Sequence, residues 1–269
     1  MLVNGVQGGL ISIRDRGLLY GDGVFRTLLV RAGQARNWPL HYQKLQHDCR
    51  RLNIACPEIG LLARELDTLL SSHTDGVFKL IVTRGEGQRG YAPPPACVAS
   101  HLWDISPRPV YPPEWLSSGI KVRICDLRLC HQPRLAGIKH LNRLENVLAA
   151  AEWCDAQIAE GLLLDNLGNV IGGTRSNVFI YSQGHLITPD LSRCGVDGVQ
   201  RQRLIAWAEQ QRVALQVRAI HLDELLQADE VFLTNSVIGL WSVRELNTRH
   251  WQSFPMADRI RREWHEGGK

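Results

Sequence analysis

The stretch Leu135-Ala-Gly-Ile-Lys-His-Leu-Asn-Arg143 carries the most specific local pattern in the chain. Its lysine, Lys139, follows apolar residues and directly precedes a helical pattern over 140–153. One face of this predicted helix is apolar and consists of Leu141, Leu144, Val147, Leu148 and Ala151. We therefore expect Lys139 at the positive end of a helix dipole and among apolar neighbours, and both features lower the pKa of an amine. A neutral lysine amine is the nucleophile of Schiff-base chemistry, although an exposed lysine at a helix start shows the same pattern.

Three further motifs follow along the chain. Gly168-Asn-Val-Ile-Gly-Gly-Thr-Arg-Ser-Asn-Val-Phe179 combines glycines and small hydroxyl residues ahead of an apolar strand, which lets the backbone approach a ligand closely. Gly198-Val-Gln-Arg201 opens a helix whose free N–H groups can bind a phosphate. Thr234-Asn-Ser236 ends a buried strand and offers hydroxyl donors. Each motif alone is also compatible with an ordinary turn, since none is a P-loop or a Rossmann fingerprint.

The composition excludes several classes of protein. The 269 residues include 31 Lys and Arg and 27 Asp and Glu, which gives a formal net charge of +4, and 44% of the residues are hydrophobic. These values are typical of globular domains and argue against disordered tails, fibres and low-complexity linkers. A charge of +4 spread over this length also predicts no nucleic-acid partner.

The seven cysteines form no metal-binding or disulfide pattern. Their number is odd, no Cys-x-x-Cys occurs, and no set of Cys and His has zinc-finger spacing. We therefore expect reduced thiols in a cytoplasmic protein, and no metal site. No run of about 18 apolar residues predicts a membrane span. The N-terminus lacks the basic and apolar regions of a signal peptide.

Strands and helices are predicted in both halves of the chain. Hydrophobic patterns predict strands at 2–6, 10–13, 24–32, 77–83, 121–125, 160–164, 177–182 and 230–234. Helical spacing predicts helices at 41–52, 59–70, 140–153, 200–211 and 222–226. Four prolines between 107 and 113 place the domain boundary, because such density stiffens a connection. We expect a smaller N-terminal α/β domain at 1–106, a proline-rich linker at 107–118 and a larger domain at 119–269, with a site at their junction.

Taken in order, the motifs resemble the branched-chain and D-amino-acid aminotransferase class of pyridoxal-phosphate enzymes. The resemblance extends from about Asn4 to Val243 and rests on Lys139 ahead of Asn142 and on three later motifs, 173–179, 198–201 and 228–236. Within that class, three segments resemble the aminodeoxychorismate lyases, namely 15–25, 84–91 and 135–145.

The resemblance implies a fold, an activity and an assembly. The fold is α+β, the two-domain D-amino-acid aminotransferase-like fold (fold type IV), with the cofactor at the domain junction and bound mainly by the larger C-terminal domain. The activity is a pyridoxal-phosphate-dependent lyase that converts 4-amino-4-deoxychorismate to 4-aminobenzoate and pyruvate in folate biosynthesis. The assembly is a homodimer. A D-amino-acid or branched-chain aminotransferase stays open as the alternative.

The resemblance also implies the residues that bind the cofactor. Lys139 would hold pyridoxal 5′-phosphate covalently and later transfer protons. The backbone N–H groups of Val199 and Gln200, together with Asn235 and Ser236, would bind the phosphate.

Four more residues match functional positions of the family. Lys44 stands where the family usually has an arginine on the phosphate, so it keeps the charge but loses the bidentate fork. Arg89 and Tyr91 match positions that hold the substrate carboxylate. Thr27 matches a threonine that contacts the substrate in the lyases, and it would protonate the leaving ether oxygen.

One departure from the family pattern lies at Gly172. The family has a glutamate there, within Glu-Gly-Thr, and that carboxylate pairs with the pyridine nitrogen and keeps the ring protonated. A glycine offers no acid, and the loss of one preorganised electrostatic partner typically costs on the order of 10²-fold in rate. A catalytically impaired variant or a non-catalytic relative is therefore a further alternative.

Overall fold

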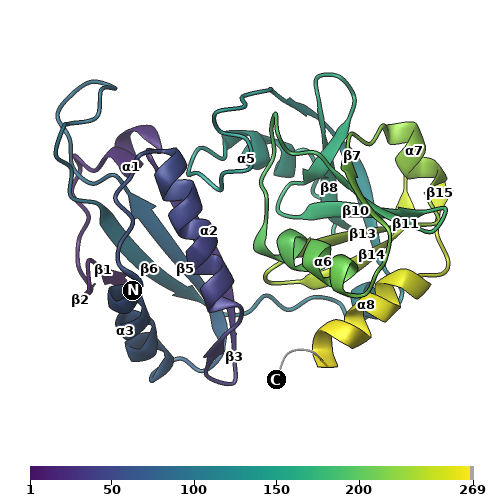
Figure 1. The fold of residues 1–269 in the computed structure, drawn as a ribbon, viewed down its shortest axis with the longest axis horizontal. Coiled ribbons are helices and arrows are strands. Elements are labelled where there is room, and N and C mark those ends of the chain that lie inside the picture. The colour runs from purple at the N-terminus through teal and green to yellow at the C-terminus, as the bar shows by residue number, and fades with distance from the viewer. Residues whose placement is uncertain (267–269) are drawn as a thin grey trace. The chain divides into compact units, whose positions relative to one another are not determined.

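The computed structural model describes residues 1–266, which form two compact units. The first unit comprises Met1–Val110 together with Ile138–Arg143, and the second comprises Tyr111–Gly137 and the chain from Leu144 onward. Both units contain helices and strands (Figure 1), so the predicted mixture of α and β structure is confirmed. The predicted linker, 107–118, spans the change from the first unit to the second.

The first unit is built on an antiparallel sheet of six strands in the order β2-β1-β6-β5-β3-β4. Its strands are β1 (Leu2–Val3), β2 (Val6–Gln7), β3 (Gly23–Arg31), β4 (Gln34–Ala35), β5 (Gly76–Thr83) and β6 (Ser100–Ser106). Its helices are α1 (Arg16–Tyr20), α2 (Trp38–Arg51) and α3 (Ile59–Leu70).

Alternation along β3 gives this sheet one buried and one open face. Val24, Leu28 and Val30 point into the core, where they pack with apolar residues of α2 and α3. The other set, which includes Phe25 and Thr27, is only partly buried. Figure 1 shows α2 lying across the sheet, as its apolar stripe of residues spaced by three and four requires.

The second unit is built on a mixed sheet of nine strands in the order β12-β11-β10-β13-β14-β7-β8-β9, with β15 paired to β14. Its strands are β7 (Ile120–Leu129), β8 (Ile158–Asp165), β9 (Val170–Gly173), β10 (Asn177–Ser182), β11 (His185–Pro189), β12 (Leu215–Arg218), β13 (Glu230–Asn235), β14 (Gly239–Leu246) and β15 (Arg249–His250). Its helices are α4 (Glu114–Ser117), α5 (Leu144–Ala150), α6 (Val199–Gln210), α7 (Leu222–Gln227) and α8 (Pro255–Glu266).

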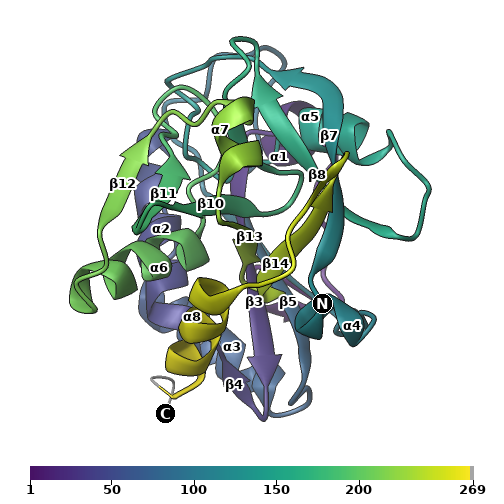
Figure 2. The same cartoon turned by 90° about the vertical axis from the view of Figure 1, so that its right-hand side faces the viewer.

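Helices α6 and α8 cover the core of the second unit together. Leu204 of α6 and Ile260 of α8 are fully buried in the same hydrophobic cluster. Trp207 donates a hydrogen bond to Glu263 at 2.8 Å, and Figure 2 shows the two helices side by side. Among residues 1–266, no helix is long and apolar enough to cross a membrane.

Two sequence predictions are wrong and one needs revision. Residues 10–13 form no strand, because Leu10 and Ile13 are exposed and have no neighbouring strand to pair with in the described chain. The predicted helix at 140–153 is confined to α5, and residues 139–141 are extended instead. The predicted strand at 2–6 is two short strands, because the chain turns at Asn4 and Gly5 with positive φ.

Candidate functional site

Lys139 lies in an extended segment beside β3 rather than at the start of a helix. Its carbonyl oxygen accepts a hydrogen bond from the Phe25 amide at 3.0 Å, and the Leu141 amide donates to the Gly23 carbonyl at 3.0 Å. Helix α5 begins only at Leu144. The expectation that a helix dipole acts on Lys139 is therefore wrong, and its electrostatics come from other neighbours.

Burial and nearby cations allow the Lys139 amine to lose its proton near physiological pH. Burial is the main cause that lowers the pKa of Lys139 to about 7, and the charges of Arg26, Arg143 and Lys79 lower it further, whereas Asp48 opposes them. The amine lies 4.3 Å from the centroid of the Phe25 ring. The predicted neutral nucleophile is thus supported, for reasons of burial and charge.

A fully buried carboxylate, Asp48, connects this lysine to α2. It accepts a hydrogen bond from the backbone N–H of Lys139 at 3.1 Å and from the ammonium of Lys44 at 2.5 Å, and it forms an ion pair with Arg26. Arg26 points into the core from β3, and Lys44 is one helical turn before Asp48. These side chains are buried, so the ion pairs are weakly screened by solvent.

The structure gives Lys44 a partner that the sequence did not predict. The predicted role of Lys44 is to bind the cofactor phosphate, and here its ammonium also neutralises Asp48. The ion pair between Lys44 and Asp48 on α2 therefore holds the Lys44 ammonium in a buried, oriented position.

The open face of the first sheet carries Thr27 and a second lysine. Thr27 lies two residues after Phe25 on β3 and therefore shares its face, and Lys79 of β5 is its direct cross-strand neighbour. The ammonium of Lys79 lies 5.1 Å from the centroid of the Phe25 ring that Lys139 also contacts. Lys79 and Lys139 thus both lie over the Phe25 ring, and Thr27 is the cross-strand neighbour of Lys79.

His140, next to Lys139 in the sequence, is a neutral imidazole. Burial and then the charge of Arg143 lower the pKa of His140 to about 4. Arg143 lies beside both ring nitrogens of His140. This imidazole adds no positive charge beside Lys139 at neutral pH.

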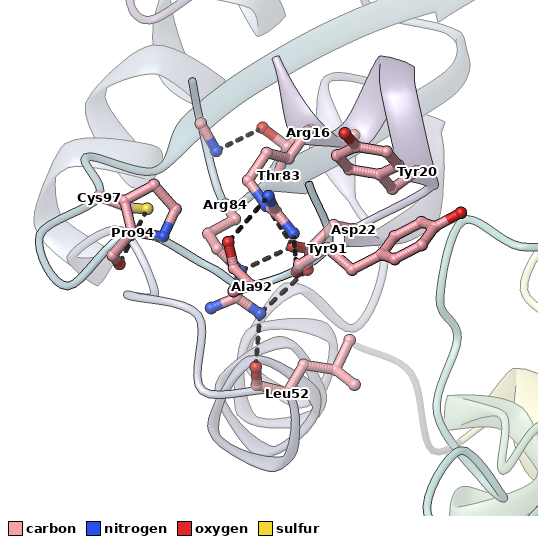
Figure 3. A network of polar contacts seen from close by, with 12 residues as sticks. Arg16, Tyr20, Asp22, Leu52, Thr83, Arg84, Tyr91, Ala92, Pro94 and Cys97 are labelled. Carbon is pink, nitrogen blue, oxygen red and sulfur yellow. Dashed lines mark hydrogen bonds and ion pairs between the residues drawn. The ribbon is translucent and has the colours of Figure 1, made fainter. Parts of the chain in front are cut away.

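Arg89 and Tyr91 lie in an exposed loop that follows β5. The side chain of Tyr91 is 85% exposed, and its ring packs edge-on against Tyr20 of α1 at a centroid distance of 5.4 Å. Figure 3 shows the backbone of this loop held by the guanidinium of Arg16, which donates to the Tyr91 carbonyl at 2.6 Å. Arg89 is exposed as well.

In the second unit, Val199 and Gln200 form the first turn of α6. Gly198 caps this helix without a side-chain hydrogen bond, so amide N–H groups of the first turn remain available. A Cβ at 198 would lie 2.4 Å from Oδ1 of Asn177, so a larger residue there would displace the side chain that accepts from the Gly198 amide. The predicted phosphate donors therefore sit at a helix N-terminus suited to an anion.

Asn177 joins the predicted phosphate-binding elements of this unit. Its side chain accepts from the Gly198 amide at 3.2 Å and donates to the Val196 carbonyl at 2.7 Å, which fixes the loop before α6. On β10 it is also the cross-strand partner of Thr234, the residue before Asn235. The start of α6 and the end of β13 therefore both meet at Asn177.

Asn235 shapes the turn that carries Ser236. Its Oδ1 accepts from the amides of Val237 and Ile238 at 2.8 and 2.9 Å, and its Nδ2 donates to the Arg175 carbonyl at 3.1 Å. Both ends of the Asn235 side chain are thus used within the protein. Asn235, which is predicted to bind the phosphate, therefore holds the turn and its backbone in place.

Gly172 is buried on β9 in a tight turn. A Cβ at this position would lie 2.9 Å from the carbonyl oxygen of Ser176, which accepts a hydrogen bond from the Gly173 amide. Glu160 holds the same turn, since its carboxylate accepts from Ser176 Oγ at 3.0 Å and from the Thr174 hydroxyl. The backbone of this turn therefore leaves little room for a side chain at 172, where the resemblance implies a glutamate.

Asp48, Arg26, Lys79 and Asn177 were not predicted as site residues, although the sequence holds a signal for three of them. Arg26 and Lys79 interrupt otherwise apolar strand patterns, and Asn177 lies inside the quoted glycine-rich motif. Asp48 has no such signal. Within residues 1–264, whose side chains the structure describes, no group of three or more His, Cys, Asp or Glu side chains could hold a metal ion.

Comparisons with known proteins identify the family of this chain. The family model described as amino-transferase class IV matches residues 23–246. An aminodeoxychorismate lyase from Vibrio harveyi is 32% identical over 264 residues, which cover 97% of this chain and 96% of that protein. A D-alanine aminotransferase from Bacillus licheniformis is 27% identical over 88% of this chain and 83% of its own length.

A solved structure is similar over the whole length. The crystal structure of 4-amino-4-deoxychorismate lyase from Pseudomonas aeruginosa is 46% identical, covers 98% of both chains and superposes with a TM-score of 0.95. The family match extends from the first residue of β3 to the last residue of β14 and so includes both groups of site residues. The chain belongs to the class IV aminotransferase family.

Proposed function

We propose that the protein is a pyridoxal-phosphate-dependent lyase that converts 4-amino-4-deoxychorismate to 4-aminobenzoate and pyruvate. The observation that carries the proposal is the amine of Lys139, whose pKa is lowered to about 7 and which lies on a sheet face that also presents Thr27 and Lys79. The lyases of Vibrio harveyi and Pseudomonas aeruginosa, similar over nearly the whole chain, support the choice of substrate.

The residues provide groups for the aldehyde and for the phosphate of pyridoxal 5′-phosphate. They differ from the family at the ring nitrogen. Lys139 offers an unprotonated amine to the aldehyde, and the start of α6 offers the N–H groups of Val199 and Gln200 to the phosphate. Gly172 offers no carboxylate to the ring nitrogen. When bound, the cofactor supplies an electrophilic carbon for the substrate amino group and a ring that withdraws electrons.

The chain's own residues then move protons and orient the substrate. The Lys139 amine takes the proton from the substrate carbon that bears the amino group. The bond between the neighbouring ring carbon and the enolpyruvyl oxygen breaks, and the carbocycle becomes aromatic. We assign to Thr27 the proton that the leaving oxygen receives, and the released enol becomes pyruvate as its proton moves from oxygen to carbon. The proton that Lys139 took then restores the Thr27 hydroxyl. Arg89 and Tyr91 bind the substrate carboxylate.

The experiment is an assay of both reactions with added cofactor. Pyruvate release from 4-amino-4-deoxychorismate supports the lyase. Amino transfer from D-alanine or leucine to 2-oxoglutarate, without pyruvate release from 4-amino-4-deoxychorismate, would replace it with the aminotransferase alternative. A purified protein that stays colourless after incubation with the cofactor would favour a non-catalytic relative.

We further propose that the chain forms a homodimer in the cytoplasm. The helix α5 exposes a row of large apolar side chains, namely Leu144, Val147 and Leu148. A row of this kind is costly to leave in water and is typical of protein interfaces. The cytoplasmic location is supported by the seven cysteines, all of which carry free thiols.

A further inference from the structure

The guanidinium of Arg16 is the centre of a polar network in the first unit (Figure 3). It donates to three successive loop carbonyls, those of Gly90, Tyr91 and Ala92, at 3.1, 2.6 and 3.5 Å. Its Nε donates to Asp22 at 2.9 Å. Arg16 is only 3% exposed, so these contacts are shielded from water.

Other contacts hold this arginine and the loop together. The Gly90 amide donates to the Tyr20 hydroxyl at 3.2 Å, and the Arg16 guanidinium stacks on the Tyr20 ring at 4.9 Å. The stem of Arg16 lies against Gly87, where a Cβ would come within 2.9 Å of Arg16 Cδ. The loop is therefore tied to α1 through both its carbonyl groups and an amide.

Asp22 joins Arg16 to a second arginine, Arg84. Burial alone would raise the pKa of Asp22, but the guanidiniums of Arg84 and Arg16 hold it below its usual value. Arg84 donates to both Asp22 oxygens, at 2.7 and 3.0 Å, and also to the carbonyls of Leu52 and Asn53. One carboxylate thus holds two arginines: the guanidinium of Arg16 donates to the carbonyls at 90–92, whereas that of Arg84, at the start of the same loop, donates to Leu52 and Asn53.

We propose that Arg16 is a positioning residue that fixes Arg89 and Tyr91 for the substrate carboxylate. The inference rests on the proposed lyase function, which assigns these two side chains to the substrate. An exposed loop with few apolar contacts opens easily unless its backbone is tied down. Arg16 supplies that tie, because its planar fork reaches the carbonyls on both sides of Tyr91 at once.

The test compares Arg16→Lys with Arg84→Lys in the cofactor-loaded protein. Lysine at 16 keeps a charge beside Asp22 but cannot donate to three carbonyls and a carboxylate together. We expect Arg16→Lys to raise KM for 4-amino-4-deoxychorismate about tenfold, the equivalent of one charge-assisted hydrogen bond, with kcat within about twofold. Arg84→Lys alters the same network at the start of the loop, where the guanidinium donates to Asp22, Leu52 and Asn53 and not to residues 90–92, and it should change KM less than about twofold. An equal rise of KM in both variants would overturn the proposal.

A double variant separates positioning from general damage. If Arg16 acts through the loop, Arg16→Lys should add little to the KM of Arg89→Met, because the group that it positions is already absent. Additive effects on KM would contradict the proposed role.

A measurement without substrate keeps this proposal distinct from the lyase assignment. Amide hydrogen exchange of residues 88–92 should accelerate at least about tenfold in Arg16→Lys and stay near the parent rate in Arg84→Lys. Unchanged exchange at 88–92 would show that Arg16 does not hold the loop backbone, whichever substrate the protein uses. Faster exchange in Arg16→Lys, together with no pyruvate release by the parent protein, would support the role of Arg16 in holding the loop. It would reject only the proposed lyase function.

Discussion

Asp48 accepts a hydrogen bond at 3.1 Å from the backbone amide of Lys139, 91 residues further along the chain. The same carboxylate is fully buried and also pairs with Arg26 and Lys44. It therefore has two effects, since it neutralises buried cations and fixes the backbone from which the Lys139 side chain projects. The two effects can be separated by substitution.

Asp48→Asn should destabilise the protein strongly. The amide can still accept a hydrogen bond from Lys139, but the charges of Arg26 and Lys44 lose their buried counter-ion. Removal of one partner from a buried ion pair costs about 3–5 kcal/mol. Denaturant unfolding of the cofactor-free protein measures this loss, and Asp48→Asn combined with Arg26→Met should recover part of it. No recovery in the double variant would show that the charge is not the cause.

The pKa of Lys139 predicts how its reaction with the cofactor depends on pH. Since the unprotonated amine is the reactive form, capture of pyridoxal 5′-phosphate by the cofactor-free protein should accelerate with rising pH around a midpoint of about 7. Arg26→Met removes a positive charge and should move the midpoint upward, while Asp48 keeps Lys44 as its partner. Stopped-flow absorbance at a series of pH values gives both midpoints, and a midpoint that stays or falls in Arg26→Met would contradict the electrostatic account.

The lowered pKa of Lys139 also makes the free energy of unfolding depend on pH. The folded pKa of Lys139 lies below its usual 10.5, so between about pH 7 and pH 10.5 the unfolded chain binds more protons than the folded one. Lys139 therefore disfavours the cofactor-free fold fully below pH 7, and this penalty fades as the pH rises towards 10.5. Lys139→Met should stabilise the cofactor-free protein more at pH 6.5 than at pH 9.5 (roughly the two ends of this window), as measured by denaturant unfolding. Equal stabilisation at both pH values would contradict the lowered pKa.

Lys139→Ala should abolish covalent capture of the cofactor and lyase turnover. Lys79→Ala is the matched control, because Lys79 lies over the same Phe25 ring but is not the predicted nucleophile. Borohydride reduction followed by mass measurement should find the cofactor attached in Lys79→Ala and not in Lys139→Ala. Normal turnover in Lys139→Ala would refute the assignment of the nucleophile.

The exposed face of α5 predicts a change of assembly. Leu148→Glu places a charge among Leu144 and Val147, and in a dimer interface it should shift the light-scattering mass from two chains to one. Leu116→Glu is the matched control, because Leu116 is 55% exposed on α4. A parent protein that is already monomeric would refute the proposed homodimer.

The elements predicted well from the sequence have apolar patterns that agree with their tertiary contacts. The prediction at 59–70 matches α3, and the prediction at 24–32 is shifted from β3 by one residue at each end. The helix predicted at 140–153 is wrong at both ends, because helical spacing of apolar residues cannot show whether they face a core or the solvent. Here Leu144, Val147 and Leu148 are exposed, and residues 139–141 hydrogen-bond to the start of β3 instead.

The site could be predicted residue by residue but not as an arrangement. Lys139 has a local motif, whereas the pairing of Asp48 with Arg26 joins residues 22 positions apart on different elements, and no local pattern records it. The lowered pKa of Lys139 was expected for a partly wrong reason, since burial does act but the helix dipole does not. Charged residues on buried faces, such as Arg26 on β3, are the signal that would have improved the prediction.

Gly172→Glu tests the departure from the family at the ring nitrogen. The new Cβ would meet the Ser176 carbonyl oxygen at 2.9 Å, so the turn that Glu160 holds must shift, and the variant should lose stability. Gly172→Ala adds the same Cβ without an acid and therefore separates the steric cost from the chemical gain. We expect Gly172→Glu, relative to Gly172→Ala, to increase amino transfer more than pyruvate release.

The physical reason is that the two reactions depend differently on the ring. Amino transfer relies on the protonated pyridine ring to stabilise carbanion charge. Loss of one electrostatic partner of this kind lowers the rate on the order of 10²-fold. Elimination from 4-amino-4-deoxychorismate is driven in large part by formation of an aromatic carbocycle, so it tolerates a glycine at 172 better. Parallel assays of both reactions in the parent, Gly172→Ala and Gly172→Glu decide the matter, and an equal gain in both reactions would refute this account of Gly172.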